Sequence, residues 1–149
     1  MFTIIGRVYD AKVRFLRATA SDAEDIVSVD KEFDCFLVNR LKDAALTQGR
    51  LLEAIARRAN WVEIFGVDAE ALHDAVDQAG VHLGRQVAIG EGYPMTAWYD
   101  DISDNSAIAS YIATGGQGDS LHKIVVLIGS PSEESGLIDE LRKHRTGDS

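Results

Sequence analysis

The chain has 149 residues, of which 46% are hydrophobic and 26% are charged, a composition typical of folded globular proteins and unlike that of disordered or fibrous ones. This length predicts a single domain, residues 1–149, with a sizeable core. The formal net charge of -9 argues against binding to nucleic acid or to an anionic membrane surface, because both depend on Lys and Arg.

The negative charge is concentrated in the middle of the chain. Residues 61–120 hold ten Asp or Glu and one basic residue, Arg85, which gives this segment a net charge of -9. An acidic surface repels nucleic acid and attracts cations or basic proteins. We therefore expect no nucleic-acid partner and consider a basic protein as the possible macromolecular partner.

The cysteine content and the length of the apolar runs bear on where in the cell the protein is expected. Cys35 is the only cysteine, so neither an internal disulfide nor a cysteine-based zinc site can form. It lies in the apolar run 33–38, where a free cysteine is usually a small buried side chain. The N-terminal apolar run is too short for a signal peptide, and no run approaches the roughly 20 residues of a membrane span. We expect a cytoplasmic protein that does not associate with membranes.

The first 60 residues predict a strand pair, a short helix, a central strand and a longer helix. Residues 13–17 alternate as in a strand with one wet face, either an edge strand or half of a hairpin with residues 3–8. A capping box opens a helix over 21–30. Residues 33–39 are apolar on both faces, as in a central parallel strand. Residues 43–59 carry apolar side chains at helical spacing.

The acidic segment begins with a strand that leads directly into a helix. Residues 61–67 have strand composition, and Asp68 is at the position of an N-cap. The helix that follows buries a stripe of apolar side chains and is predicted to end at Gly80, acting as its C-terminal cap. Residues 81–89 predict a loop with a short strand, and residues 90–94 predict a turn.

Another strand and helix complete the segment. Residues 95–99 have strand composition, and residues 104–113 predict a helix that buries Tyr111 along with two isoleucines. Residues 114–119 are rich in glycine and predict a flexible loop.

The C-terminal part predicts one strand and one helix. Residues 123–129 form the clearest strand of the chain, a continuous apolar run that ends in glycine. Ser130 and Glu133, with a proline between them, form a capping box for the last helix. The tail after Arg145 is expected to fray.

The repeated alternation of strand and helix predicts an α/β fold, a single-domain, three-layer, Rossmann-like sandwich with a mostly parallel sheet. In such a sheet, ligands bind outside the carboxyl ends of the strands. The residues predicted to gather at that edge are Asn39, Arg40, Asp68, Asp100, Asp101, Gly129 and Ser130.

Glu70, His73 and Asp77 share one face of the predicted helix, because they are three and four residues apart. Such a group can bind a divalent metal, or it can pair a general base with an orienting carboxylate. A solvated acidic face is the more common reason for this pattern, and we prefer it. We therefore assign neither a metal ligand nor a catalytic residue.

Asp100 and Asp101 follow a strand, as do the carboxylates that hold Mg²⁺ in phosphoryl-transfer enzymes. They can equally favour the N-terminus of the next helix through its dipole. The chain lacks both a P-loop and the Gly-x-Ser-x-Gly pattern of serine hydrolases, and the glycines of 115–118 follow a helix rather than a strand. We prefer the structural role for both aspartates and expect no cofactor.

Aromatic residues surround the acidic segment. Trp61 and Trp98 are interpreted as core residues, because core packing is their commonest role in a chain of this size. Tyr93 and Tyr99 fit core packing and a protein interface equally well.

The pattern Trp61, Gly66, His73-Asp74 and Asp77, followed by residues 95–101, resembles a family of small uncharacterised bacterial proteins. In that family a tryptophan strand, a His-Asp helix and a Met-Thr-Thr-Trp-His-Asp-Asp type segment occur in this order. The likeness covers about residues 33–113, and it implies a fold but no activity. Tyr99 stands here in place of the family's histidine.

Two hypotheses follow. The first is a non-catalytic protein-binding module, such as an immunity-type inhibitor that covers a basic toxin with an acidic face. The alternative is a small metal-dependent hydrolase or phosphoryl-transfer enzyme that uses Asp68, His73, Asp100 and Asp101. The oligomeric state is open. The residues predicted to bind a protein partner are Glu70, His73, Asp74, Asp77, Glu91, Tyr93, Tyr99, Asp100 and Asp101.

Overall fold

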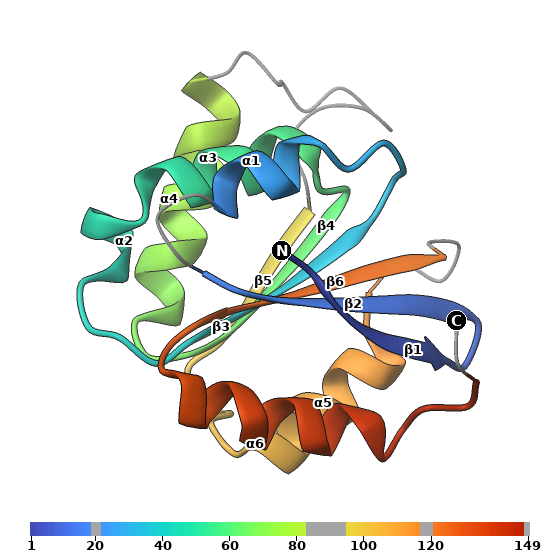
Figure 1. Cartoon of the computed structure of the whole chain (residues 1–149). Coiled ribbons are helices and arrows are strands. Elements are labelled where there is room, and N and C mark those ends of the chain that lie inside the picture. The colour runs from blue at the N-terminus through green and yellow to red at the C-terminus, as the bar shows by residue number, and fades with distance from the viewer. Residues whose placement is uncertain (19–21, 83–94, 117–120, 148–149) are drawn as a thin grey trace.

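A six-stranded sheet flanked by helices forms the centre of the computed structural model, which describes residues 1–18, 22–82, 95–116 and 121–147 (Figure 1). The strands lie in the order β1-β2-β6-β3-β4-β5. Their bounds are β1 (Thr3–Val8), β2 (Ala11–Arg17), β3 (Asp34–Asn39), β4 (Trp61–Gly66), β5 (Met95–Tyr99) and β6 (His122–Ile128).

The sheet is mixed but mostly parallel. β1 pairs with β2 in antiparallel fashion, and every other neighbouring pair is parallel. The predicted α/β class and the mostly parallel sheet are therefore confirmed, and of the two alternatives for residues 13–17 the hairpin with residues 3–8 is the one found. β3 and β6 lie in the middle of the sheet and are buried along almost their whole length, which agrees with their apolar sequences.

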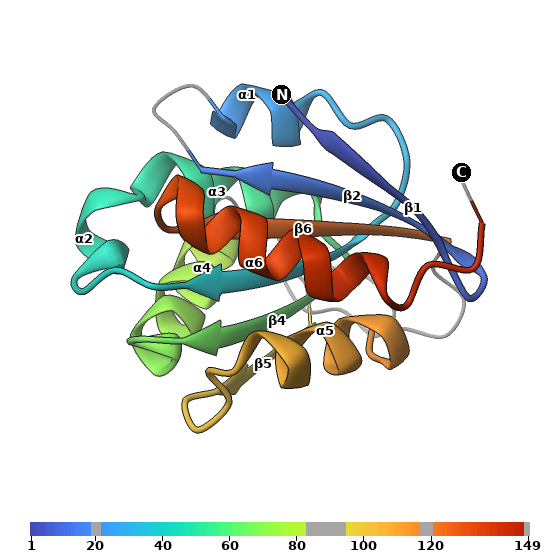
Figure 2. The same cartoon turned by 60° about the horizontal axis from the view of Figure 1, so that its bottom comes forward.

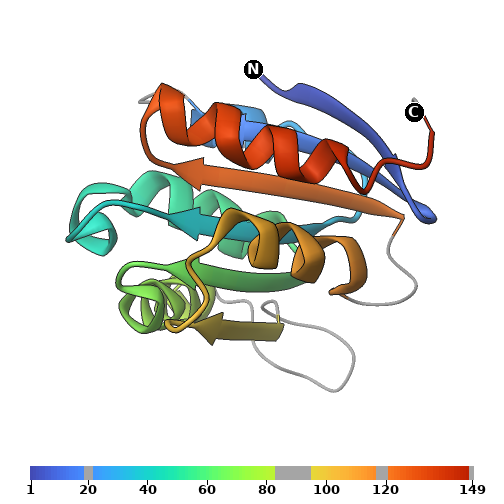
Figure 3. The same ribbon diagram turned by 90° about the horizontal axis from the view of Figure 1, so that it is seen from below.

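Helices cover both faces of the sheet (Figures 2 and 3). α1, α3 and α4 pack side by side on one face, and α5 and α6 pack together on the other. Within the described ranges, no helix is both long and apolar enough to cross a membrane. The helices are α1 (Asp22–Val27), α2 (Ala44–Thr47), α3 (Gly49–Arg58), α4 (Ala69–His82), α5 (Asn105–Thr114) and α6 (Pro131–Arg142).

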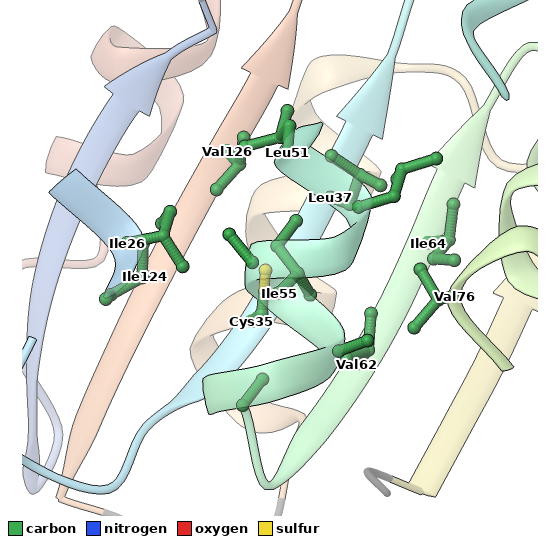
Figure 4. Packing of buried hydrophobic residues seen from close by; sticks show 14 of the residues in the cluster. Ile26, Cys35, Leu37, Leu51, Ile55, Val62, Ile64, Val76, Ile124 and Val126 are labelled. Carbon is green, nitrogen blue, oxygen red and sulfur yellow. The ribbon is translucent and has the colours of Figure 1, made fainter. Parts of the chain in front are cut away.

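The core under α1, α3 and α4 consists of aliphatic side chains from alternate positions of the central strands (Figure 4). Leu37 and Val62 meet Ile55 of α3, and all three are fully buried. Each such side chain stabilises the fold by about 1.5–3 kcal/mol relative to its exposed state. Cys35 lies in the same layer, where burial and then the charge of Asp34 raise the pKa of its thiol. Its predicted role as a small core residue is confirmed.

The core on the opposite face is more aromatic. Phe15, Phe36 and Phe65 are fully buried under α5 and α6, together with Leu137 and Leu141 of α6. α6 begins as predicted, because the Ser130 side chain accepts from the backbone of residue 133 and the Glu133 carboxylate accepts from the Ser130 backbone N–H.

Several predicted helix boundaries were wrong. The helix predicted over 43–59 is divided at Gln48 into α2 and α3. Gly80 does not end α4, which continues to His82. Asp68 directly precedes α4 with φ at 54°, outside the extended range of a usual N-cap, and its carboxylate accepts from the Asp43 backbone N–H at 3.0 Å. The tertiary contact with the α2 segment therefore decides its conformation.

Two further predictions about burial and order were wrong. Tyr111 is 42% exposed, because it lies at the margin of α5 with its ring edge against Phe65. The tail after Arg145 is paired as far as residue 147, since Arg7 donates its backbone N–H to Gly147 at 2.7 Å and accepts from Thr146. Of the loop and short strand predicted over 81–89, residues 81 and 82 belong instead to α4, and the remainder, with the turn predicted over 90–94, lies outside the described residues.

Asn39 ties together two loops at the carboxyl edge of the sheet. Its buried amide donates to the carbonyl oxygens of Leu41 at 2.8 Å and Val67 at 2.6 Å, and its side-chain oxygen accepts from the Leu41 backbone. Gly66 lies beside it with φ at 97°, and a Cβ there would press against the Asn39 carbonyl oxygen. This close approach requires glycine at the end of β4.

We expect Gly66→Ala to lower the free energy of unfolding by more than about 2 kcal/mol, because it adds backbone strain and a contact with the Asn39 carbonyl. Gly49→Ala is the matched control, since a Cβ there meets nothing within 4 Å and alanine favours helix. Urea unfolding of both variants measures the difference. Equal stability of the two would contradict this account of the carboxyl edge.

Candidate functional site

One margin of the predicted acidic face of α4, at His73 and Asp77, lies against edge strand β5. Asp77 accepts a hydrogen bond from the hydroxyl of Thr96 at 3.0 Å, and the ring of His73 lies 6.4 Å from that of Trp98. Thr96 and Trp98 project to the same side of β5 because they are two residues apart. These two contacts fix the position of the helix along the strand.

The register of α4 against β5 brings the start of the helix to the carboxyl end of the strand. Moving four residues back along α4 and two forward along β5 covers a similar distance, about 6 Å. The same step from His73 and Trp98 leads to Ala69, the first residue of α4, and to Asp100, directly after β5. We define Glu70, Asp74, Asp77, Asp100 and Asp101 as the acidic strip.

The members of the acidic strip differ in exposure. Glu70, Asp100 and Asp101 are exposed, and the side chain of Asp74 is 65% exposed. Asp77 is half-buried by its contact with β5. The strip is therefore a solvated surface, which agrees with the preferred interpretation of the sequence.

His73 pairs with carboxylates of its own helix. Its Nδ1 lies 3.2 Å from Asp74 and its Nε2 lies 3.6 Å from Asp77, while the side chain is 20% exposed. The imidazole is thereby enclosed between Trp98 and two aspartates.

Asp100 and Asp101 stand between β5 and α5 without capping that helix. Asp104 is the N-cap of α5, and its carboxylate accepts from the Ala107 backbone N–H at 3.3 Å. Among the described residues, no group of three or more His, Cys, Asp or Glu lies close enough to hold a metal ion. Glu91 and Tyr93, two other predicted partner-binding residues, lie outside the described part of the chain.

Tyr99 lies on the opposite side of β5 from Trp98. Its ring stacks on Phe65 with centroids 5.2 Å apart and lies 5.4 Å from Tyr111. Burial raises the pKa of Tyr99, and the charge of Glu63 and a hydrogen bond to it act in the same direction. Tyr99 and Tyr111 therefore form an aromatic margin on the face covered by α5.

The sequence interpretation missed a buried polar cluster made by Asp34, Glu63 and Lys123, which we call the buried charge cluster. Glu63 accepts from the indole of Trp61 and from the backbone of Gly116, both at 2.8 Å. The signal was a charged residue in each of three largely apolar strands: Asp34 at the start of β3, Glu63 within β4 and Lys123 near the start of β6.

Lys123 joins this cluster to the end of α5. Its ammonium donates to the carbonyl oxygens of Ile112 at 2.7 Å and Ala113 at 3.2 Å, which are among the carbonyls that a helix leaves unsatisfied at its C-terminus. Burial lowers the pKa of Lys123, while the charges of Asp34 and Glu63 act in the opposite direction. The cluster therefore fixes α5 on the sheet.

The carboxyl edge also contains a hollow of about 340 Å³ between the starts of α5 and α6. Arg40 lies in it and donates to the side-chain oxygen of Asn105 at 2.7 Å. Asp104 and Glu133 line the same hollow, so its charge is mixed. The predicted gathering at this edge is confirmed by the strand register, because Asn39 pairs with both Gly66 and Ile128 and the parallel strands β3, β4, β5 and β6 all end there. The guanidinium of Arg40 joins the end of β3 to α5.

Comparison with protein-family models and with curated proteins finds no match for this chain.

We expect Lys123→Met to lower the free energy of unfolding by about 2–4 kcal/mol, because it leaves two helix carbonyls and the nearby carboxylates without a cation. Lys42→Met removes the same charge from an exposed position and should change stability by less than about 0.5 kcal/mol. Chemical denaturation compares the two. Similar small effects of both would show that the buried charge cluster does not stabilise the fold.

Tyr99→Phe should lower the free energy of unfolding by about 1 kcal/mol, because it removes a side-chain hydrogen bond. It should also remove from the titration curve the tyrosine whose pKa is raised above the ordinary value of 10.0. Folded Tyr99 keeps its proton at pH values where the unfolded chain has lost it. Its contribution is therefore complete below pH 10 and declines as the pH rises through the raised pKa.

Tyrosinate absorbance as a function of pH measures this titration. Tyr9→Phe is the control, since Tyr9 is 56% exposed and makes no aromatic stack among the described residues. If the wild-type chain and Tyr99→Phe gave the same titration curve at the most alkaline pH values, the assigned contact of Tyr99 with Glu63 would be contradicted.

Proposed function

We propose that this chain is a non-catalytic protein-binding module whose acidic strip binds a basic protein. The specific form that we favour is an immunity-type inhibitor of a basic toxin. The observation that carries the proposal is the packing of α4 on edge strand β5, where Asp77 accepts a hydrogen bond from Thr96. The exposed carboxylates Glu70, Asp74, Asp100 and Asp101 belong to these two packed elements or directly follow them.

The electrostatics of the acidic strip support a basic partner. Glu63 is buried in the charge cluster, but Glu70, Asp100 and Asp101 are exposed to solvent. Exposed charges of one sign steer an oppositely charged protein and raise its association rate more than its final affinity. The interaction should therefore weaken as salt increases, because exposed charges are screened over about 10 Å at 0.1 M.

Edge strand β5 adds a second element of recognition. One side of β5 pairs with β4, and within the described residues no strand pairs with its other side. Trp98 and Tyr99 are half-buried on its two faces, and the exposed Tyr111 lies beside Tyr99 in the aromatic margin. Aromatic side chains beside free backbone groups suit a protein interface.

The proposal includes one prediction about the type of fold and one about the family of the chain. The fold is taken as one Rossmann-like, three-layer sandwich over residues 1–149, and the chain is taken as a relative of the small uncharacterised bacterial proteins that it resembles. The metal-dependent alternative gains no specific support, because His73 pairs with Asp74 and Asp77 and the described residues contain no converging set of metal ligands.

The test is capture of partners from a lysate of the native host, followed by kinetic measurement with the recovered partner. The partner should be a basic protein released by salt. Asp74→Lys should slow its association at least about threefold, because it reverses an exposed charge in the acidic strip.

Asp139→Lys is the matched control, because it makes the same charge change at an exposed position of α6, which lies across the sheet from α4. The proposal fails if both variants slow association equally, since the effect would then reflect net charge alone. It also fails if the recovered partner binds independently of salt.

A further inference from the structure

A hollow of about 220 Å³ lies at the edge of the sheet opposite to the acidic strip, over β2 and the start of β6. Basic side chains line it in a chain whose net charge is -9. They come from three segments: Lys12 and Arg14 of β2, His122 of β6, and Lys31 of the connection between α1 and β3.

The strand register explains why these side chains converge. Lys12 pairs with His122 across the parallel strands, and Arg14 projects to the same face as Lys12 because it is two residues further along. The guanidinium of Arg14 lies 4.9 Å from the ring centre of Phe2, which limits its freedom. The site is therefore held by the sheet.

The hollow carries an excess of positive charge. Lys12, Arg14 and Lys31 face a single lining carboxylate, that of Asp30. The pKa of His122 agrees with this excess of positive charge. Burial and then the charges of Arg14, Lys12 and Lys31 lower that pKa, while the charge of Asp30 raises it. Like charges gathered in one concavity repel each other, and a bound anion relieves that repulsion.

We propose that this hollow binds the phosphate group of a small molecule. The guanidinium of Arg14 offers two parallel donors to phosphate oxygens, and Lys12 and Lys31 supply compact charges around them. Ile4, which is 58% exposed at the lining, offers an apolar surface to any organic group joined to the phosphate. The volume lies below the usual range for drug-sized ligands, which favours a small one.

Titration of the full chain with inorganic phosphate, followed through the NMR signals of the His122 imidazole, tests the site. At constant ionic strength maintained with chloride, phosphate should give a saturable shift and raise the pKa of His122, because a nearby anion favours the imidazolium. Lys31→Gln should weaken binding about two- to fivefold, as expected for one exposed charge contact.

Lys42→Gln is the control, since it removes an exposed charge at the carboxyl edge. Adenosine 5′-monophosphate provides the second ligand: tighter binding than that of phosphate assigns the site to a monoester, and equal binding assigns it to free phosphate. The proposal is overturned if phosphate acts no differently from chloride, or if Lys31→Gln and Lys42→Gln weaken binding equally. Neither result bears on the acidic strip.

Discussion

Burial of the central strands on both faces is the constraint on which the rest of this structure depends. β3 and β6 expose almost no surface, so each face of the sheet must be covered by helices. α1, α3 and α4 cover one face, and α5 and α6 cover the other, so the loops after the two central strands β3 and β6 lead to opposite faces. The charged surfaces lie toward the two edges of the sheet: the acidic strip beside edge strand β5 and the basic hollow over β1 and β2.

The elements of the fold could be predicted where local sequence determines structure. The apolar run of β6 and the capping box at Ser130 are visible in the sequence, and both are found. The predictions that were wrong depend on contacts between distant segments. Asp68 is held by the Asp43 backbone, and the C-terminal tail is held by Arg7. The start of α4 and the order of the tail could therefore not be predicted from the local sequence.

The candidate site was predictable as a set of residues but not as a surface. Helical spacing places Glu70 and His73 on one face, whereas the packing of that face on β5 depends on the contact of Asp77 with Thr96. The buried charge cluster was missed because a charge inside an apolar strand gives no indication of its partners. The partners of Lys123 are the carbonyl oxygens at the end of α5, which no spacing rule brings to it.

The central claim is that α4 and β5 together form the protein-binding surface. Hydrogen exchange of the chain, free and in complex with its captured partner, tests this claim most directly. We expect slower exchange on binding for the backbone amides of α4 and β5, and unchanged exchange for α6 on the opposite face. Protection confined to α6 or to the β1–β2 hairpin would contradict the assignment.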